Sequence, residues 1–367
     1  MSDLFSEITI RAKKIKNRVV MPPMVCFEHP AINGIVTDAH VQHYSQRARG
    51  GTGLIIIEAT CVNPSGRLSQ GQLGLWVDTQ IPGFKKIADA CHQYGALVMV
   101  QLHHAGLAVA SGITKSIIAP SGYFGVVRPG GTEINAREMT QEEIRGIQND
   151  FVAASIRAKK AGLDGFELHG AHGFLISQFL SSLVNRRDDA YGGNLLKRTR
   201  FVKEIITGVR RSCGEDFIID CRMGCNEPDL ADGIAIAQEL EKAGVDILHV
   251  SSGMNNIVEG KAKIVISVPG SFDYNWICYG GTQIKTKVKV PVIVCNGIRT
   301  PERASYLIEN GLADFAAIGK SMLVDPDWVN KAQRKETPIP CIECKICSHF
   351  RAESACPQAK VNSASPQ

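Results

Sequence analysis

The stretch DGFELHGAHGFLISQFLSSLVNRRDDAYGG, residues 164–193, decides the fold, because it joins a short apolar strand to a polar turn. Residues 165–168 are apolar and follow a helical pattern, so they predict a buried strand. His169 and His172 then fall at the carboxyl end of that strand, where α/β folds place their chemistry. Two imidazoles three residues apart on such a turn could hold a substrate oxygen through their N–H groups.

The same two histidines have simpler interpretations. They could cap the turn or bind backbone carbonyls, which is the commoner role of an arbitrary histidine pair. A zinc site is less favoured, because no third ligand lies nearby at a familiar spacing. These residues alone therefore leave the role of His169 and His172 open.

The composition indicates a globular protein with a large core. The chain has 367 residues, 44% of them hydrophobic, which suits one barrel with a tail or two ordinary domains. Its 41 basic and 36 acidic residues are well mixed and give a net charge of +5, which argues against a dedicated nucleic-acid surface. The first residues contain no apolar leader, and no apolar run is long enough to span a bilayer. We expect a soluble, cytosolic protein without a nucleic-acid or membrane partner.

Apolar runs alternate with helical patterns eight times along the chain. The expected strands are residues 19–21, 54–57, 97–100, 165–168, 217–220, 247–250, 292–294 and 315–318. The expected helices are residues 83–94, 141–161, 195–211, 234–243 and 301–310, several of which end in turn-forming glycines such as Gly95, Gly162 and Gly244. Continuous apolar strands separated by helices predict an α/β fold of the TIM (β/α)8 barrel type. A doubly wound sheet is the alternative, but its glycine-rich phosphate turn is absent after the first strand.

Residues 105–139 form a long connection rich in Gly, Pro and Ser. Structureless connections of this length are usually functional or mobile, so we expect an active-site loop here.

Four of the 12 cysteines crowd together near the end of the chain. Cys341, Cys344, Cys347 and Cys356 have the spacing C-x2-C-x2-C-x8-C and precede Pro357. Thiolates so spaced can wrap one metal centre, and a proline after the last cysteine is typical of iron–sulfur ligation. We expect a four-iron four-sulfur (4Fe-4S) cluster, with structural zinc and redox-active or unligated thiols as alternatives. Most other cysteines are scattered singly in apolar strands, which excludes a secreted disulfide framework.

The stretch HGAHGFLISQFLSSLVNRRDDAYGG resembles the signature of the old yellow enzyme family of flavin-dependent reductases. NRVVMPPM (17–24), GGTGLIIIEAT (50–60), QLHHAG (101–106) and IDCRMG (219–224) extend the resemblance over nearly the whole barrel. The resemblance implies a flavin mononucleotide (FMN) cofactor and hydride transfer from flavin N5 to an activated C=C bond of an enone, enoate or enoyl thioester. It also implies that His169 and His172 bind the carbonyl oxygen of that small-molecule substrate.

The resemblance further implies contacts with the flavin ring. Pro23, Met24 and Ala59 would touch the ring, and Gln101 would bind its pyrimidine edge. Arg222 would face the N1/O2 locus, where a fixed cation stabilises the anionic reduced flavin. We accordingly expect a flavin-binding barrel over residues 1–335 and a cysteine-rich extension over residues 336–367.

Two glycine turns are candidate binding sites for the flavin phosphate. CNGIRTPE (295–302) and AIGKSML (317–323) each end a strand, turn on glycine and open a helix, which favours a phosphate site at Gly297, Gly319 and Lys320. The family typically has arginine at the position of Lys320, and lysine keeps the charge without the bidentate fork. Without the resemblance, both turns would be interpreted as plain helix entries.

Phe174 departs from the family, which usually has a proton-delivering tyrosine there. Val25 and Phe27 are also apolar where some relatives have Cys and Tyr. The proton for the substrate α-carbon would then come from Tyr123, from His249 or from water.

Two other functions stay open at this level. The same barrel occurs in amine dehydrogenases and demethylases, which take hydride from a C–N bond, and Trp76, Trp276 and Tyr279 could form the aromatic cage that such a substrate needs. The second open function is a non-catalytic barrel whose zinc-binding tail docks a partner.

The cysteine cluster also bears on partners. Larger family members of the 2,4-dienoyl-CoA reductase and trimethylamine dehydrogenase type carry a similar cluster and then a nucleotide-binding region. This chain stops at Gln367, so we expect a separate electron-transfer protein. The oligomeric state stays open, and a homo-oligomer is compatible with the sequence.

Overall fold

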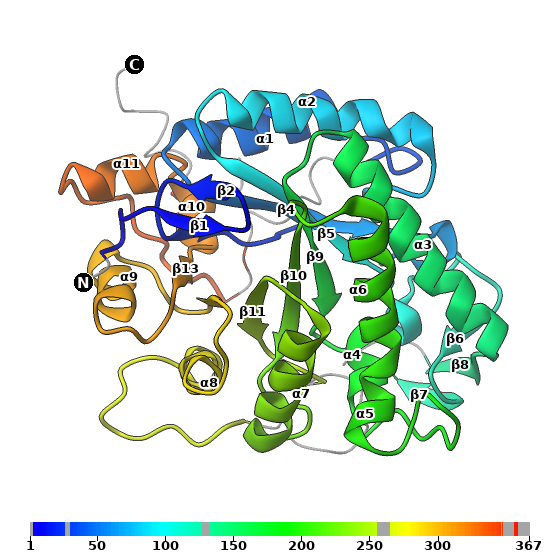
Figure 1. Cartoon of the computed structure of the whole chain (residues 1–367). Coiled ribbons are helices and arrows are strands. Elements are labelled where there is room, and N and C mark those ends of the chain that lie inside the picture. Colours follow the sequence, from blue (N-terminus) through cyan, green and yellow to red (C-terminus); the bar gives the residue numbers. More distant parts are fainter. Residues whose placement is uncertain are drawn as a thin grey trace.

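The computed structural model of the chain describes residues 3–25, 30–126, 133–254, 265–345, 347 and 356–358. Eight parallel strands close into a barrel in the order β10-β11-β12-β13-β3-β4-β5-β9 (Figure 1). They are β3 (Val19–Met21), β4 (Leu54–Cys61), β5 (Leu97–His103), β9 (Gly165–Gly170), β10 (Ile218–Gly224), β11 (Ile247–Ser251), β12 (Val292–Val294) and β13 (Phe315–Ala317). All eight expected strands are confirmed, and the closed barrel excludes the doubly wound sheet.

Helices cover the outside of the barrel (Figure 1). They are α1 (Asp38–Arg49), α2 (Ile81–His92), α3 (Gln141–Lys160), α4 (Leu175–Leu180), α5 (Leu195–Arg198), α6 (Arg200–Cys213), α7 (Leu230–Ala243), α8 (Trp276–Lys285), α9 (Pro301–Glu309), α10 (Lys320–Val324) and α11 (Trp328–Gln333). Short 3-10 turns occur at Pro64–Gly66, Asp78–Gln80 and Gly106–Ala108.

Local sequence signals set the helix ends. At the start of α3, the Thr140 hydroxyl accepts from the Glu143 amide at 3.2 Å and the Glu143 carboxylate accepts from the Thr140 amide at 2.9 Å. Gly244 ends α7 with a φ of +96°, as expected for a turn-forming glycine. The single helix expected over residues 195–211 is wrong, because the chain breaks at Thr199 into α5 and α6.

A three-stranded sheet lies within the long connection after β5. It contains β6 (Ile117–Ala119), β7 (Tyr123–Val126) and β8 (Glu133–Glu138). The expectation of a structureless loop is therefore wrong over these residues. Arg187 holds this insertion to the signature stretch, because its guanidinium donates to the carbonyls of Pro120 at 2.7 Å and Met139 at 2.8 Å.

The barrel interior is apolar at one end and polar at the other. Towards the amino ends of the strands it holds Leu54, Ile56, Met99, Ile218, Ile247, Ile293 and Phe315, all fully buried. Ile10 and Ile15 of the hairpin β1 (Ile8–Ile10) and β2 (Lys13–Ile15) pack against this layer and close that end. Because side chains alternate along a strand, the next inward positions towards the carboxyl ends are Gln101, His103, Glu167, His169, Asp220, Arg222, His249 and Ser251. The polar groups thus gather where barrel chemistry occurs.

In the described part of the chain, no helix combines the length and apolar character needed to cross a membrane.

Candidate active site

A cavity of about 360 Å³ opens at the polar end of the barrel. Its walls include seven of the residues that the sequence assigned to the site, namely Pro23, Met24, His172, Arg222, Gly297, Gly319 and Lys320. These residues come from the ends of five different strands or the turns after them, so closure of the barrel brings them together.

The other assigned barrel residues lie next to the cavity or below it. His169 precedes the turn to His172 and is 6% exposed. Gln101 is buried and donates to the Glu167 carboxylate at 2.6 Å, and Ala59 is buried with its carbonyl accepting from Gln72 at 2.8 Å. Neither Gln101 nor Ala59 is among the described residues of the cavity wall, so their flavin contacts stay predictions.

The charge of the cavity wall suits an anionic cofactor. Among the described residues, the wall contains the cations Arg222, Arg299 and Lys320 and no carboxylate. Two buried polar atoms, Arg222 Nε and Ser321 Oγ, lack a hydrogen-bond partner within the described chain. A buried donor without a partner costs free energy, so a bound group that accepts from these atoms would stabilise the site. The wall therefore fits an anionic group such as FMN, and the positions of its ring at Arg222 and of its phosphate at Lys320 stay predictions.

The two glycine turns let the backbone come close to such a ligand. Gly297 has a φ of +77°, a conformation that is costly for other residues, and a Cβ there would meet the Asn275 amide at 2.9 Å. Gly319 precedes α10 at the end of β13. The assignment of Gly297, Gly319 and Lys320 to a phosphate stays a proposal that this geometry supports.

A chain of hydrogen bonds joins His103, His169 and His172 at the outer edge of the polar layer. His103 Nδ1 lies 3.1 Å from His169 Nδ1, and His169 Nε2 lies 2.9 Å from His172 Nδ1. His172 Nε2 then lies 2.8 Å from the Ser251 hydroxyl. His172 has a φ of +62°, and its amide is held by the Ser252 carbonyl at 3.0 Å. A left-handed conformation at a non-glycine residue is strained, and such strain clusters at functional sites.

The two signature histidines are neutral. Burial lowers the pKa of His169 well below its usual range, and the neighbouring imidazoles of His103 and His172 and the Arg222 cation oppose its protonation further. Burial and then Arg222 lower the pKa of His172 in the same way. A neutral imidazole offers one N–H donor, which suits a carbonyl oxygen better than a cation.

Phe174 covers this network with an apolar ring. Its centroid lies 4.5 Å from His103, 4.7 Å from His169 and 6.5 Å from His172. A hydroxyl on this ring would therefore belong to the same site as the histidines. Tyr123 packs against the apolar cluster that contains Phe174, and its hydroxyl donates to the Val126 carbonyl at 3.1 Å.

His249 does not reach the substrate space. It is fully buried, its Nδ1 lies 2.6 Å from Glu167, and it is absent from the described cavity wall. Tyr123 is likewise absent from the described cavity wall, so its place as proton donor stays a prediction beside water. Val25 is also absent from that wall, and Phe27 lies outside the described residues.

The structure does not bring the expected cage residues together around the cavity. Trp76 lies beside Gly34 and Gly74, and Trp276 begins α8. Tyr279 meets Phe272 edge to face with ring centroids 5.2 Å apart. None of the three aromatic side chains belongs to the described cavity wall.

Sequence reasoning missed His103 and Ser251, which extend the histidine network at both ends. Both residues end barrel strands, so their positions in QLHHAG and at the end of residues 247–250 were the available signal.

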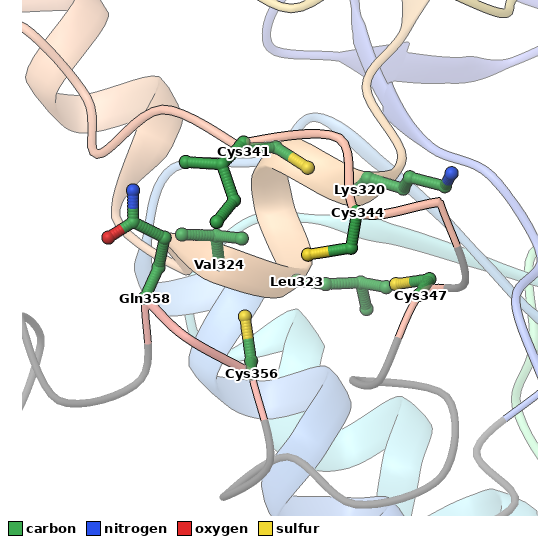
Figure 2. A pocket seen from close by; sticks show the side chains of 9 residues that line it. Lys320, Leu323, Val324, Cys341, Cys344, Cys347, Cys356 and Gln358 are labelled. Atoms are coloured by element: carbon green, nitrogen blue, oxygen red, sulfur yellow. The ribbon is translucent and has the colours of Figure 1, made fainter.

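The four tail cysteines surround a second, smaller pocket (Figure 2). Figure 2 shows the sulfur atoms of Cys341, Cys344, Cys347 and Cys356 directed towards a shared space beside Leu323. All cysteines that the structure describes are free thiols, which agrees with the absence of a disulfide framework. Four soft sulfur donors around one space form a set that binds iron–sulfur clusters or zinc.

Lys320 connects the two sites, because it lines both the cysteine pocket and the large cavity. Arg299 of the cavity wall also pairs with Glu343, which lies between the first two tail cysteines. The tail is therefore attached to the cavity at its proposed phosphate end.

Comparison with known proteins identifies the family. Residues 3–337 match the profile of the NADH:flavin oxidoreductase / NADH oxidase family. The chain belongs to this family. It is therefore a flavin-dependent oxidoreductase of the old yellow enzyme type with FMN as its cofactor, which excludes a non-catalytic barrel.

Individual relatives agree with this assignment. An NADH oxidase from Thermoanaerobacter brockii is 41% identical over 358 residues, which cover 94% of this chain and 53% of that protein. An NADPH dehydrogenase from Listeria welshimeri is 36% identical over 337 residues, which cover 90% of this chain and 94% of that protein. A solved structure of 2-naphthoyl-CoA reductase with 2-naphthoyl-CoA superposes with a TM-score of 0.83 at 25% identity, over 95% of this chain and 55% of that one. The chain thus spans about half the length of two of these relatives.

Proposed function

We propose that this chain reduces an electron-poor C=C bond conjugated to a carbonyl group of a small molecule. FMN, when bound, supplies the hydride for the β-carbon. The neutral His169–His172 pair at the cavity carries the proposal, because N–H donors held by neighbouring groups stabilise charge that develops on a substrate oxygen.

The chain's own residues have separate roles in this proposal. His172 lines the cavity, and its Nε2–H exchanges the Ser251 hydroxyl for the substrate oxygen when substrate binds. His169 and His103 fix the orientation of the His172 ring through its Nδ1. Phe174 excludes water from the histidines and delivers no proton. The α-carbon proton then comes from Tyr123 or from water.

A substrate panel tests the proposal. FMN-loaded protein is reduced anaerobically and mixed with an enone, an enoate or an enoyl thioester, and return of the flavin absorbance is followed. We expect at least one of the three to reoxidise the flavin with formation of the saturated product. If none does, while a tertiary amine reduces the oxidised flavin, the reaction is oxidative and the proposal is wrong.

We also propose that Cys341, Cys344, Cys347 and Cys356 hold a 4Fe-4S cluster that exchanges electrons between the flavin and a separate protein. The shared wall residue Lys320 supports this, because it places the cysteine pocket beside the cavity. Burial and the neighbouring Cys347 raise the pKa of Cys341 above its usual range, although Lys320 and Arg299 oppose this rise. A bound metal would favour the thiolate, because thiols bind metals in their deprotonated form.

Elemental analysis of anaerobically purified protein tests the cluster. We expect about four iron atoms per chain for a four-iron cluster. Cys344→Ser is expected to lose the iron and the broad absorption while FMN stays bound. Cys91→Ser, a matched change on α2 outside the described cysteine pocket, is expected to keep both. Zinc in place of iron would contradict the redox role.

A further inference from the structure

A buried acid–base cluster lies directly beneath the flavin cavity. It consists of Glu167 on β9, Asp220 on β10 and His249 on β11, all with 0% exposure. Asp220 and Glu167 are paired in register on neighbouring strands, and the ligand atoms of the three side chains lie within 4.8 Å of one another. The proposed reaction uses none of these three residues.

The contacts show which carboxyl group is ionised. The two oxygens of Glu167 accept from Gln101 Nε2 at 2.6 Å and face His249 Nδ1 at 2.6 Å. Burial raises the pKa of Glu167, but the positive charges of His249 and Arg222 outweigh burial and lower it. Burial and Arg222 oppose protonation of His249, yet Glu167 raises the His249 pKa overall. Glu167 and His249 therefore form a buried ion pair.

The environment of Asp220, in contrast to that of Glu167, favours the neutral carboxyl group. Neither of its carboxyl oxygens meets a donor in normal hydrogen-bond geometry among the described residues, and the adjacent Glu167 carboxylate is the group that can accept a proton held on Asp220. Burial, and then the negative charge of Glu167, raise the pKa of Asp220 well above its usual range. Two adjacent buried carboxylates do not both ionise, so the proton resides on Asp220.

Arg222 lies two residues beyond Asp220 on the same face of β10 and lines the cavity. No salt bridge to Arg222 occurs within the described chain, and its Nε has no partner there. An ionised Asp220 would be a counter-ion directly below this guanidinium. A neutral Asp220 leaves the charge of Arg222 directed to the cavity.

We infer that Asp220 is a positioning residue, which Glu167 keeps protonated so that Asp220 does not neutralise the positive charge that Arg222 presents to the flavin. The inference rests on the proposed placement of the flavin ring at Arg222. It gives a reason for the second buried carboxyl group, since a barrel interior gains no stability from an acid whose oxygens have no hydrogen-bond partner.

One other titrating group faces Arg222 and has to be separated from Asp220. Cys295, at the end of β12, has its Sγ 4.0 Å from Arg222 Nη2 and lines the cavity. Burial raises its pKa, but His249 and Arg222 lower it to about 7. Cys295→Ser removes this titration and serves as the background for the test.

The test measures the flavin midpoint potential of the FMN-loaded protein at pH 6 in the Cys295→Ser background, with and without Asp220→Asn. A neutral Asp220 predicts that asparagine changes the equilibrium constant for flavin reduction by less than about threefold. An ionised Asp220 predicts that removing its charge favours reduction by at least about tenfold, which is about 30 mV for a two-electron couple. That second result would overturn the inference.

Infrared spectroscopy of the unmutated protein provides a measurement that does not depend on the variant. With carboxyl-labelled aspartate, we expect an isotope-sensitive carboxylic-acid band that persists at pH 8, where exposed aspartates are ionised. Absence of that band, or a divalent metal that elemental analysis finds lost in Asp220→Asn, would contradict a proton on Asp220. Failure to bind FMN at all would instead contradict the proposed placement of the flavin, and the infrared result would remain valid.

Discussion

The two ends of the barrel interior differ in what fills them. The amino ends of the strands enclose Met99, Ile293, Phe315 and other apolar side chains beneath a hairpin plug. The carboxyl ends enclose histidines, buried acids and Arg222, several with unsatisfied atoms. The first arrangement maximises apolar burial, and the second gives up some stability to hold charge. Substitutions at the apolar end should therefore change unfolding, and substitutions at the polar end should change flavin and ligand chemistry.

Phe174→Tyr should give the largest effect at the polar end. A phenol at this position lies over the histidines and can deliver a proton to the substrate α-carbon. If proton delivery is slow, turnover on a simple enone should rise, with about 10²–10⁴-fold as the upper range for general acid help. Steady-state and single-turnover rates check this.

Tyr123→Phe is the companion to that variant. It removes the hydroxyl of a ring that packs against the apolar cluster containing Phe174. A lower turnover in Tyr123→Phe, restored by adding Phe174→Tyr, would identify Tyr123 as the native donor. Unchanged enone reduction in Phe174→Tyr would contradict the assignment of slow proton delivery to this position.

Phe315→Ala should have the largest effect on stability at the apolar end. Phe315 is fully buried in the lower layer, so its truncation leaves a cavity there. We expect a loss of about 3–5 kcal/mol in the free energy of unfolding. Urea unfolding measures the loss, and flavin content per folded chain should stay unchanged. A large loss of flavin from protein that remains folded would contradict the assignment of stability to the apolar end and of flavin binding to the polar end.

His172→Ala should have an intermediate effect on ligand binding. It removes the donor that lines the cavity, and a lost hydrogen bond of about 1–2 kcal/mol weakens binding roughly 5–30-fold. Titration with a phenol, followed through the flavin absorbance, measures the change. Ser252→Ala, a change in the same wall, is the control and should bind normally. Equal weakening in both variants would argue for a general disturbance of the cavity.

The pH dependence of that binding should be the smallest effect. His169 and His172 have pKa values well below 6.5, so both rings are neutral above pH 6.5 and do not change charge between pH 6.5 and 8. Cys295 in the same wall has a pKa of about 7, so the measurement uses the Cys295→Ser protein, which lacks this titration. Phenol affinity of that protein should be nearly constant over this range, at pH values below the pKa of the phenol. A decrease of affinity as the pH falls from 8 to 6.5 would show that the imidazoles titrate there.

The sequence predicted the barrel well because each strand is a short apolar run between helices, which is a local signal. It failed where structure depends on distant partners. The sheet β6–β8 forms in a segment without apolar periodicity. Its partner Arg187, which donates to the Met139 carbonyl, lies 48 positions after Met139 in the sequence. The division of residues 195–211 at Thr199 likewise has no clear sequence signal.

The site shows the same limit. Pro23, Arg222 and Lys320 could be assigned to one cavity because family motifs carry them, and the structure brings all three into its wall. Asp220 lies in the same motif as Arg222, and His249 was predicted only as a proton donor. The meeting of both with Glu167 could not be predicted, because it arises from strand register across the barrel. Local patterns predict which residues end strands, and only closure of the barrel determines which of them meet.

The most direct test of the account is the flavin content and midpoint potential of Arg222→Ala, compared with Arg222→Lys and with Met99→Leu at the apolar end. The account predicts a lower FMN content or a lower midpoint potential in Arg222→Ala, because the cation that faces the reduced flavin is lost. Arg222→Lys should be intermediate, and Met99→Leu should match the unchanged protein. Unchanged FMN content together with unchanged potential in Arg222→Ala would contradict the central claim that Arg222 at the polar end holds the flavin.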